Sequence, residues 1–272
     1  MPEGLLASPV PQVTVVYDVL PLHYPEEYPR QQYYFRHYVP AVLAASRRII
    51  VCSESTRRDI RHFYPRVAPE RLQVVALGYD VRRFAPAAPA AKAAPPYALY
   101  IGNVMPHKNL VRVVEAFATL RSRVDARLVI RGSGRRRNVE MLRARIDALG
   151  LGGHVDWAPY AEAAALPDLY RRARVLLLPS LYEGFGLTAL EAMACGTPVI
   201  TSNVSSLPEV VGEAAVLVDP RDTAGLAEAM ARVFTDDALA GDLTIRGLSR
   251  AKLFSWETTG RVVQAALRDA AA

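Results

Sequence analysis

Two carboxylates, Glu183 and Glu191, stand with seven residues between them around a turn that contains Gly184 and Gly186. Residues 187–194 favour helix, so the turn leads directly into a helix start. The free N–H groups at a helix start suit the binding of a phosphate. A glutamate early in a helix also complements the helix dipole without any ligand. The spacing alone therefore leaves open both a ligand site and a purely structural role.

The elements around this turn predict where it lies in the fold. Residues 175–178 are an apolar run, which is typical of a buried strand in a parallel sheet. Gly196-Thr197-Pro198 ends the helix, and residues 199–200 begin another strand. Strand, glycine turn, helix and strand make a βαβ unit. Ligands of open α/β sheets bind where such strands end and helices begin.

The segment 179–202, PSLYEGFGLTALEAMACGTPVITS, resembles the E-x7-E signature of the GT4 family of retaining glycosyltransferases, which have the GT-B fold. The resemblance covers about residues 13–265, and its specific motifs lie at 100–115 and 175–220. It implies an α/β protein of the GT-B class with two Rossmann-like lobes, of which the N-terminal lobe is incomplete.

The resemblance also implies a domain organisation. Residues 85–96 form a Pro/Ala tract without periodicity, which is typical of a linker. We expect residues 1–84 to form a partial N-terminal, acceptor-side lobe and residues 97–255 to form the lobe that binds a nucleotide sugar. Residues 256–272 are expected to be a helix that crosses back to the first lobe. Only about three strands precede the tract, so the sequence predicts an N-terminally truncated first lobe.

Hydrophobic periodicity predicts the remaining elements. A loop is expected at residues 20–29, because it holds three prolines, and Gly132-Ser133-Gly134 is expected to be a simple turn. Ser53 is the expected N-cap of a helix. Further strands are predicted at residues 13–17, 48–52, 72–76, 97–102, 127–130 and 155–157, and further helices at 31–45, 111–120, 139–149, 166–172, 223–234 and 256–270.

The resemblance assigns roles at the site. Negative charge builds on the diphosphate as the glycosidic bond breaks, and Lys108 is the candidate cation that stabilises it. Glu191 is expected to accept hydrogen bonds from ribose hydroxyls, since a carboxylate offers only acceptors. Glu183 is expected to hold the sugar hydroxyls rather than act as a nucleophile. The resemblance therefore implies that the catalytic residues are Glu183 and Lys108 and that the donor-binding residues are Gly102, Asn103, His107, Lys108, Gly184, Phe185, Gly186, Leu187 and Glu191.

The sequence departs from the family pattern at three positions. Asn103 stands where the family often has an arginine, and His107 and Lys108 are expected to compensate. Tyr17 stands where a histidine often lies near the transferred sugar, and nothing in the sequence promotes His23, which is close by, to that role. Thr188 replaces a common proline, which is harmless for backbone geometry.

Composition narrows the class of protein. The chain has 272 residues and a net charge of +6, and its basic clusters come without a nucleic-acid-binding motif. No run of 18 apolar residues occurs and the first residues lack a basic region before a long apolar one, so we expect neither a transmembrane helix nor a signal peptide. Cys52 and Cys195 are expected to be reduced core residues, and no metal-ligand spacing occurs. We expect a cytoplasmic protein, with peripheral contact at an anionic inner membrane face left open, and an unknown oligomeric state.

The resemblance implies a hexosyltransferase of polysaccharide biosynthesis. It would move a hexose from a nucleotide-diphosphate sugar to a glycan or lipid-linked glycan, with no metal and no cofactor. Mannose, carried by GDP-mannose, is favoured because the residue patterns around Lys108 and after Ser202 resemble those of mannosyltransferases of polysaccharide assembly. The alternatives are an inactive donor-binding fragment or partner subunit, and a nucleotide-sugar epimerase of the same fold.

Overall fold

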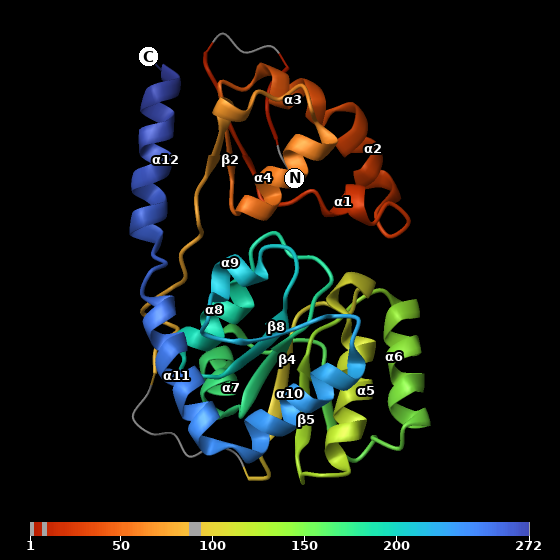
Figure 1. Ribbon diagram of the computed structural model, residues 1–272. Coiled ribbons are helices and arrows are strands. Elements are labelled where there is room, and N and C mark those ends of the chain that lie inside the picture. Colours follow the sequence, from red (N-terminus) through yellow and green to blue (C-terminus); the bar gives the residue numbers. More distant parts are fainter. Residues whose placement is uncertain (1–2, 7–9, 87–93, 272) are drawn as a thin grey trace. The chain divides into compact units, whose positions relative to one another are not determined.

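The computed structural model describes residues 3–6, 10–86 and 94–271, and the chain forms two compact units within it (Figure 1). The first unit consists of Met1–Gly78, Tyr182–Gly186 and Phe254–Ala272. The second consists of Tyr79–Leu181 and Leu187–Leu253. The domain limits predicted from the sequence stay a prediction, and residues 87–93 of the predicted linker lie outside the described residues.

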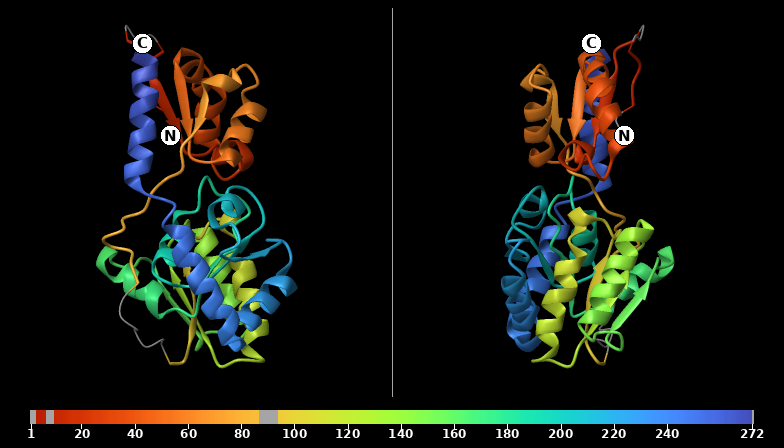
Figure 2. Two further views of the ribbon diagram at one scale, coloured as in Figure 1. Left: turned by 60° about the vertical axis from the view of Figure 1, so that its left-hand side comes forward. Right: turned by 90° about the vertical axis from the view of Figure 1, so that its right-hand side faces the viewer.

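The first unit is built on a three-stranded parallel sheet of order β1-β2-β3. Its strands are β1 (Val13–Val16), β2 (Arg48–Val51) and β3 (Leu72–Val74). Ile49 and Val51 of β2 pack with the helices that follow each strand, whereas Ile50 packs with Ala266 of α12 (Trp256–Ala271). Because successive side chains of a strand point to opposite faces, the helices of this unit cover both faces of its sheet (Figure 2).

Two sequence predictions for the helices of this unit are wrong. The predicted loop 20–29 contains α1 (Leu20–His23), whose Pro21 lies in the first helical turn, where no intrahelical N–H bond is needed. The predicted helix 31–45 is two helices, α2 (Pro29–His37) and α3 (Val39–Ala45). Pro40 separates them, because it cannot donate to the carbonyl four residues earlier. The predicted cap of α4 (Glu54–Phe63) is confirmed, since the Ser53 side chain accepts from the Thr56 N–H at 3.0 Å.

The second unit contains a six-stranded parallel sheet of order β6-β5-β4-β7-β8-β9. The chain builds outward from β4 to β6 and then returns to the other side of β4 with β7. This reversal makes the carboxyl ends of β4 and β7 the topological switch point of the sheet. The strands are β4 (Tyr97–Ile101), β5 (Arg127–Arg131), β6 (Val155–Ala158), β7 (Val175–Leu178), β8 (Val199–Ser202) and β9 (Val216–Val218).

Helices cover both faces of this sheet, as the apolar runs of its strands require. Ala98 and Tyr100 of β4 pack in the core with Phe117 of α5 and Met230 of α10, while the equally buried Leu99 points to the opposite face. The helices of the unit are α5 (Leu110–Arg121), α6 (Arg136–Ala148), α7 (Leu166–Arg172), α8 (Leu187–Ala194), α9 (Leu207–Val211), α10 (Thr223–Thr235) and α11 (Asp237–Ala251).

The predicted α/β class with parallel sheets is confirmed, and most predicted elements lie within two residues of their observed bounds. Helix α6 begins at Arg136 rather than at residue 139. The sequence had assigned neither β9 nor the helix α11. Within the described ranges, no helix combines the length and the apolar character that crossing a bilayer requires.

Candidate functional site

The loops that leave β4 and β7 are joined by hydrogen bonds at the switch point of the second unit. The Leu181 N–H donates to the His107 carbonyl at 2.7 Å. The buried Asn109 side chain donates to the Pro179 carbonyl at 2.9 Å and to the Pro220 carbonyl at 2.6 Å. Lys108 ends the short 3-10 turn η2 (Pro106–Lys108) between these two attachments. The residues on either side of Lys108 are therefore bonded to the loop that leaves β7, at Pro179 and Leu181.

A cavity of about 250 Å³ opens at the carboxyl ends of β4 and β5. Gly132 lies so close to the preceding loop that a Cβ atom there would be 1.7 Å from the Gly102 carbonyl oxygen. The Gly-Ser-Gly segment is thus more than the simple turn expected from the sequence, since only glycine permits this approach. The cavity is lined by Ile101, Gly102, Asn103, Arg131, Gly132, Ser133, Tyr160, Ala161 and Leu166.

The polar wall of this cavity is ordered by its own contacts. Ser133 Oγ donates to the Tyr160 hydroxyl at 2.6 Å, and the Tyr100 hydroxyl donates to the Asn103 carbonyl at 2.8 Å. Arg131 contacts both carboxylate oxygens of Asp156, at 3.3 and 2.8 Å. The sequence singled out Gly102 and Asn103 but missed Arg131, Ser133 and Tyr160. The only sequence signal for them was their position just after strands.

Glu191 lies in the second turn of α8, where the fully buried Tyr170 of α7 holds it. The Tyr170 hydroxyl donates to Glu191 Oε2 at 2.9 Å. Burial raises the pKa of Glu191, whereas the Tyr170 hydrogen bond and the positive charge of Arg83 act in the opposite direction. A half-buried carboxylate with one oxygen already oriented suits the recognition of a diol.

The other half of the E-x7-E segment, Tyr182–Gly186, belongs to the first unit. The Gly184 carbonyl accepts from Ser53 Oγ at 2.8 Å and from Cys52 Sγ at 3.1 Å. A Cβ atom on Gly184 would lie 2.5 Å from the Tyr17 carbonyl oxygen, so this position requires glycine. Glu183, Gly184, Phe185 and Gly186 therefore lie together in the first unit, whereas Gly102, Asn103, His107, Lys108, Leu187 and Glu191 lie in the second.

The structure gives His23 a polar environment that the sequence did not indicate. His23 Nε2 lies 3.3 Å from Asp59 Oδ1, and the Tyr182 hydroxyl donates to Asp59 Oδ2 at 2.8 Å. Tyr17, at the position where the family often has a histidine, is 56% exposed. His23, Asp59 and Tyr182 come from three separate segments, so no local pattern could have grouped them.

The sequence also led to expectations about the two cysteines and about metal binding. Cys52 and Cys195 are both free and buried, as expected, and burial raises the pKa of each thiol to about 12. Among the described residues, no group of three or more His, Cys, Asp or Glu side chains is arranged to hold a metal ion. The absence of a metal from the reaction stays a prediction, as do the roles of the individual site residues.

Comparison with known protein sequences supports the family resemblance. The model of the family described as "Glycosyl transferases group 1" matches residues 81–249. The O-antigen chain mannosyltransferase B of Escherichia coli is 41% identical over 162 residues, which are 59% of this chain and 42% of that protein. A D-inositol 3-phosphate glycosyltransferase of Acidothermus cellulolyticus is 34% identical over 248 residues, 85% of this chain and 55% of that protein. The chain thus spans about half the length of the curated relatives it matches.

Comparison with solved structures agrees with the fold. The sucrose-phosphate synthase of Thermosynechococcus elongatus superposes with a TM-score of 0.80 and 28% identity, over 94% of this chain and 67% of that one. Anabaena HepE, solved in complex with UDP-glucose, superposes with a TM-score of 0.83 at 19% identity, over 95% of this chain and 72% of that one. The predicted GT-B class and the GT4 resemblance are confirmed: this chain belongs to the group 1 family of glycosyl transferases.

Proposed function

We propose that the chain carries the donor-binding machinery of a retaining glycosyltransferase. The enzyme would move a hexose from a nucleotide-diphosphate sugar to a glycan or a lipid-linked glycan acceptor. The observation that carries this proposal is the pair of loops at the β4/β7 switch point, where Leu181 donates to the His107 carbonyl beside Lys108. Family membership and a switch-point site with a cation, a helix start and an oriented carboxylate all support it.

The proposed chemistry assigns a task to each group. As the bond from the sugar C1 to the diphosphate oxygen breaks, Lys108 and the N–H groups at the start of α8 stabilise the charge that develops on the phosphates. Glu191 accepts from the ribose hydroxyls, and Glu183 accepts from the hydroxyls of the sugar. The acceptor oxygen bonds to C1 on the same face, and the leaving phosphate takes the acceptor proton. No metal is needed in this scheme.

The sugar we propose is mannose, supplied as GDP-mannose. The support is the 41% identity to a relative that is named a mannosyltransferase. The competing choice is a uridine nucleotide, because HepE was solved with UDP-glucose, although at 19% identity that likeness concerns the fold alone. A lipid-linked acceptor would place the enzyme at the inner face of a membrane, with its net positive charge favouring anionic lipid.

The test is calorimetric titration of the chain with GDP and with UDP. Lys108→Ala is compared with Lys252→Ala, which removes an exposed lysine from the same unit. A hydrogen bond to a charged group is worth about 1.5–3 kcal/mol, so we expect Lys108→Ala to weaken binding of the cognate nucleotide roughly 10- to 150-fold. The control should match the original chain. Binding of neither nucleotide, or equal binding by both variants, would contradict the proposal.

Product analysis separates the proposal from its two alternatives. A transferase releases the nucleoside diphosphate and extends an added glycan. An epimerase changes the sugar of the donor with no acceptor present. A donor-binding fragment or partner subunit binds the nucleotide sugar and does neither.

A further inference from the structure

The segment that contains Glu183 is attached to the first unit by the side chain of Tyr182. Tyr182 is 7% exposed, and its hydroxyl donates to Asp59 Oδ2 at 2.8 Å. Burial and the nearby Asp59 carboxylate raise the pKa of Tyr182, so the hydroxyl keeps its proton and acts as the donor. The contact is therefore a hydrogen bond from a buried phenol to a carboxylate. A hydrogen bond with an ionised acceptor is stronger than one between two neutral groups.

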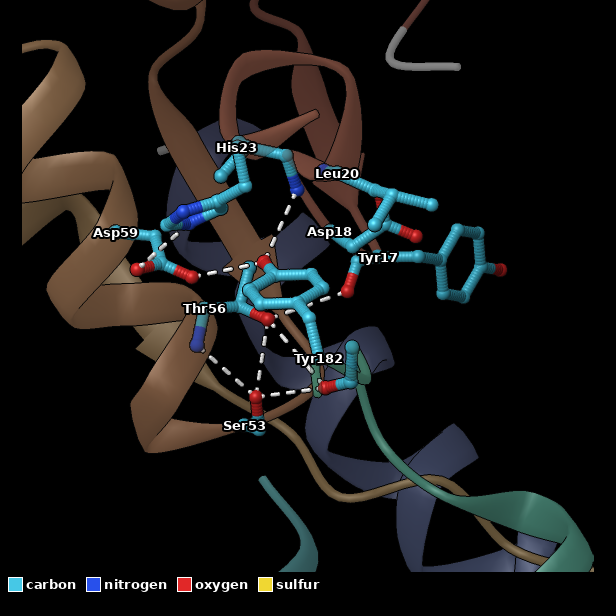
Figure 3. Close-up of polar contacts among 10 residues, drawn as sticks. Tyr17, Asp18, Leu20, His23, Ser53, Thr56, Asp59 and Tyr182 are labelled. Atoms are coloured by element: carbon cyan, nitrogen blue, oxygen red, sulfur yellow. Dashed lines mark hydrogen bonds and ion pairs between the residues drawn. The ribbon is translucent and has the colours of Figure 1, made fainter. Parts of the chain in front are cut away.

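Asp59 is itself held from its other side. His23 Nε2 lies 3.3 Å from Asp59 Oδ1, and the Asp59 side chain is 17% exposed. The His23 ring packs on the Tyr182 ring with a centroid separation of 4.5 Å and meets the Phe63 ring edge-on at 5.0 Å. Figure 3 shows the Tyr182 hydroxyl directed at Asp59 within this group. Both carboxylate oxygens have partners, so the acceptor for Tyr182 is fixed in place.

A second attachment lies two residues further along the chain. The Gly184 carbonyl accepts from Ser53 Oγ at 2.8 Å and from Thr56 Oγ1 at 3.4 Å, at the start of α4. The Phe185 ring then packs edge-on against Phe254 at 5.9 Å. Glu183 lies between a side-chain attachment on one side and a backbone attachment on the other. Its backbone consequently has little freedom to rotate.

We propose that Tyr182 is a positioning residue that, bonded to Asp59, holds the Glu183–Gly186 backbone in the single arrangement that receives the transferred sugar. The proposal rests on the proposed function for the identity of the ligand. The attachment itself follows from the contacts of the first unit. It predicts that losing the Tyr182 hydroxyl harms recognition of the sugar while leaving recognition of the nucleotide intact.

The experiment compares Tyr182→Phe and Asp59→Asn with Tyr33→Phe in the full chain. Tyr33→Phe is the matched control, because it removes a hydroxyl from the same unit at a residue that is 69% exposed. The first measurement is backbone hydrogen exchange in peptides that cover residues 182–186 and, as an internal reference, β7. The second is calorimetric affinity for UDP and UDP-glucose, and for GDP and GDP-mannose. For each pair, the ratio of the affinity for the sugar nucleotide to the affinity for the plain nucleotide measures how much the sugar contributes to binding.

We expect exchange at 182–186 to be roughly tenfold faster or more in both test variants, with β7 and the control unchanged. The ratio of the affinity for the sugar nucleotide to that for the plain nucleotide should fall by a similar factor, while the affinity for the plain nucleotide itself stays constant. A merely structural loss would lower both affinities together. Unchanged exchange at 182–186, or an unchanged affinity ratio, overturns the proposal. If the original chain binds no nucleotide, the proposed function fails, and the exchange comparison still decides whether Tyr182 holds the segment.

Discussion

Replacing Tyr170 by phenylalanine tests the claim that a buried phenol orients Glu191. The change removes one oxygen atom and keeps the ring, which packs against Phe84 with a centroid separation of 5.9 Å. What is lost is the 2.9 Å hydrogen bond to Glu191 Oε2. Because the acceptor is a carboxylate, the loss should cost about 1.5–3 kcal/mol in the stability of the second unit. For a unit of this size the melting temperature should fall by roughly 3–12 °C.

The pH dependence of this loss is part of the prediction. The Tyr170 hydrogen bond favours the charged form of Glu191, although burial raises the pKa of the group overall. The bond therefore contributes fully above that raised pKa, and its contribution falls as the pH drops through it. Scanning calorimetry at neutral and at acidic pH, with Tyr33→Phe as the control, measures both effects. A melting temperature that stays at the control value at neutral pH would refute the reasoning.

Two further predictions concern the E-x7-E segment. Gly184→Ala should destabilise the first unit by about 1–3 kcal/mol, because the new methyl group would lie 2.5 Å from the Tyr17 carbonyl oxygen; chemical denaturation checks this, and an unchanged midpoint would contradict it. Glu191→Gln should flatten the pH dependence of stability. The raised pKa of Glu191 means that the folded chain keeps this proton longer than the unfolded chain, so stability falls as the pH rises from the ordinary value of 4.5 to the raised one. Urea denaturation of both proteins between about pH 4 and 7 measures the slope, and equal slopes would show that Glu191 is not responsible.

The sequence predicted the elements that local patterns specify. The apolar runs of β4, β5 and β7 and the helix-forming residues of α8 lie where periodicity and propensity expected them. Ser53 was identified as a cap because its hydroxyl accepts from the Thr56 N–H only three residues along the chain, which makes the cap a local feature. The break at Pro40 was missed because an apolar periodicity that continues through a proline still looks like one helix.

The groupings that depend on distant segments were not predictable in this way. Tyr170 and Glu191 meet because α7 packs beside α8. Gly132 requires glycine because the chain returns past Gly102, which a turn motif alone does not reveal. His23, Asp59 and Tyr182 are brought together by tertiary packing in the first unit.

The sequence by itself determined the family, the parallel α/β class and the residue types available at the site. The E-x7-E motif and the order of strands and helices can be read directly from the amino-acid sequence. Tertiary structure decided which compact unit holds each part of that motif, with Tyr182–Gly186 in the first unit and α8 in the second. It also decided which groups orient the two glutamate-bearing segments. Those choices depend on hydrogen bonds and close approaches between residues far apart in the chain, for which local sequence carries no signal.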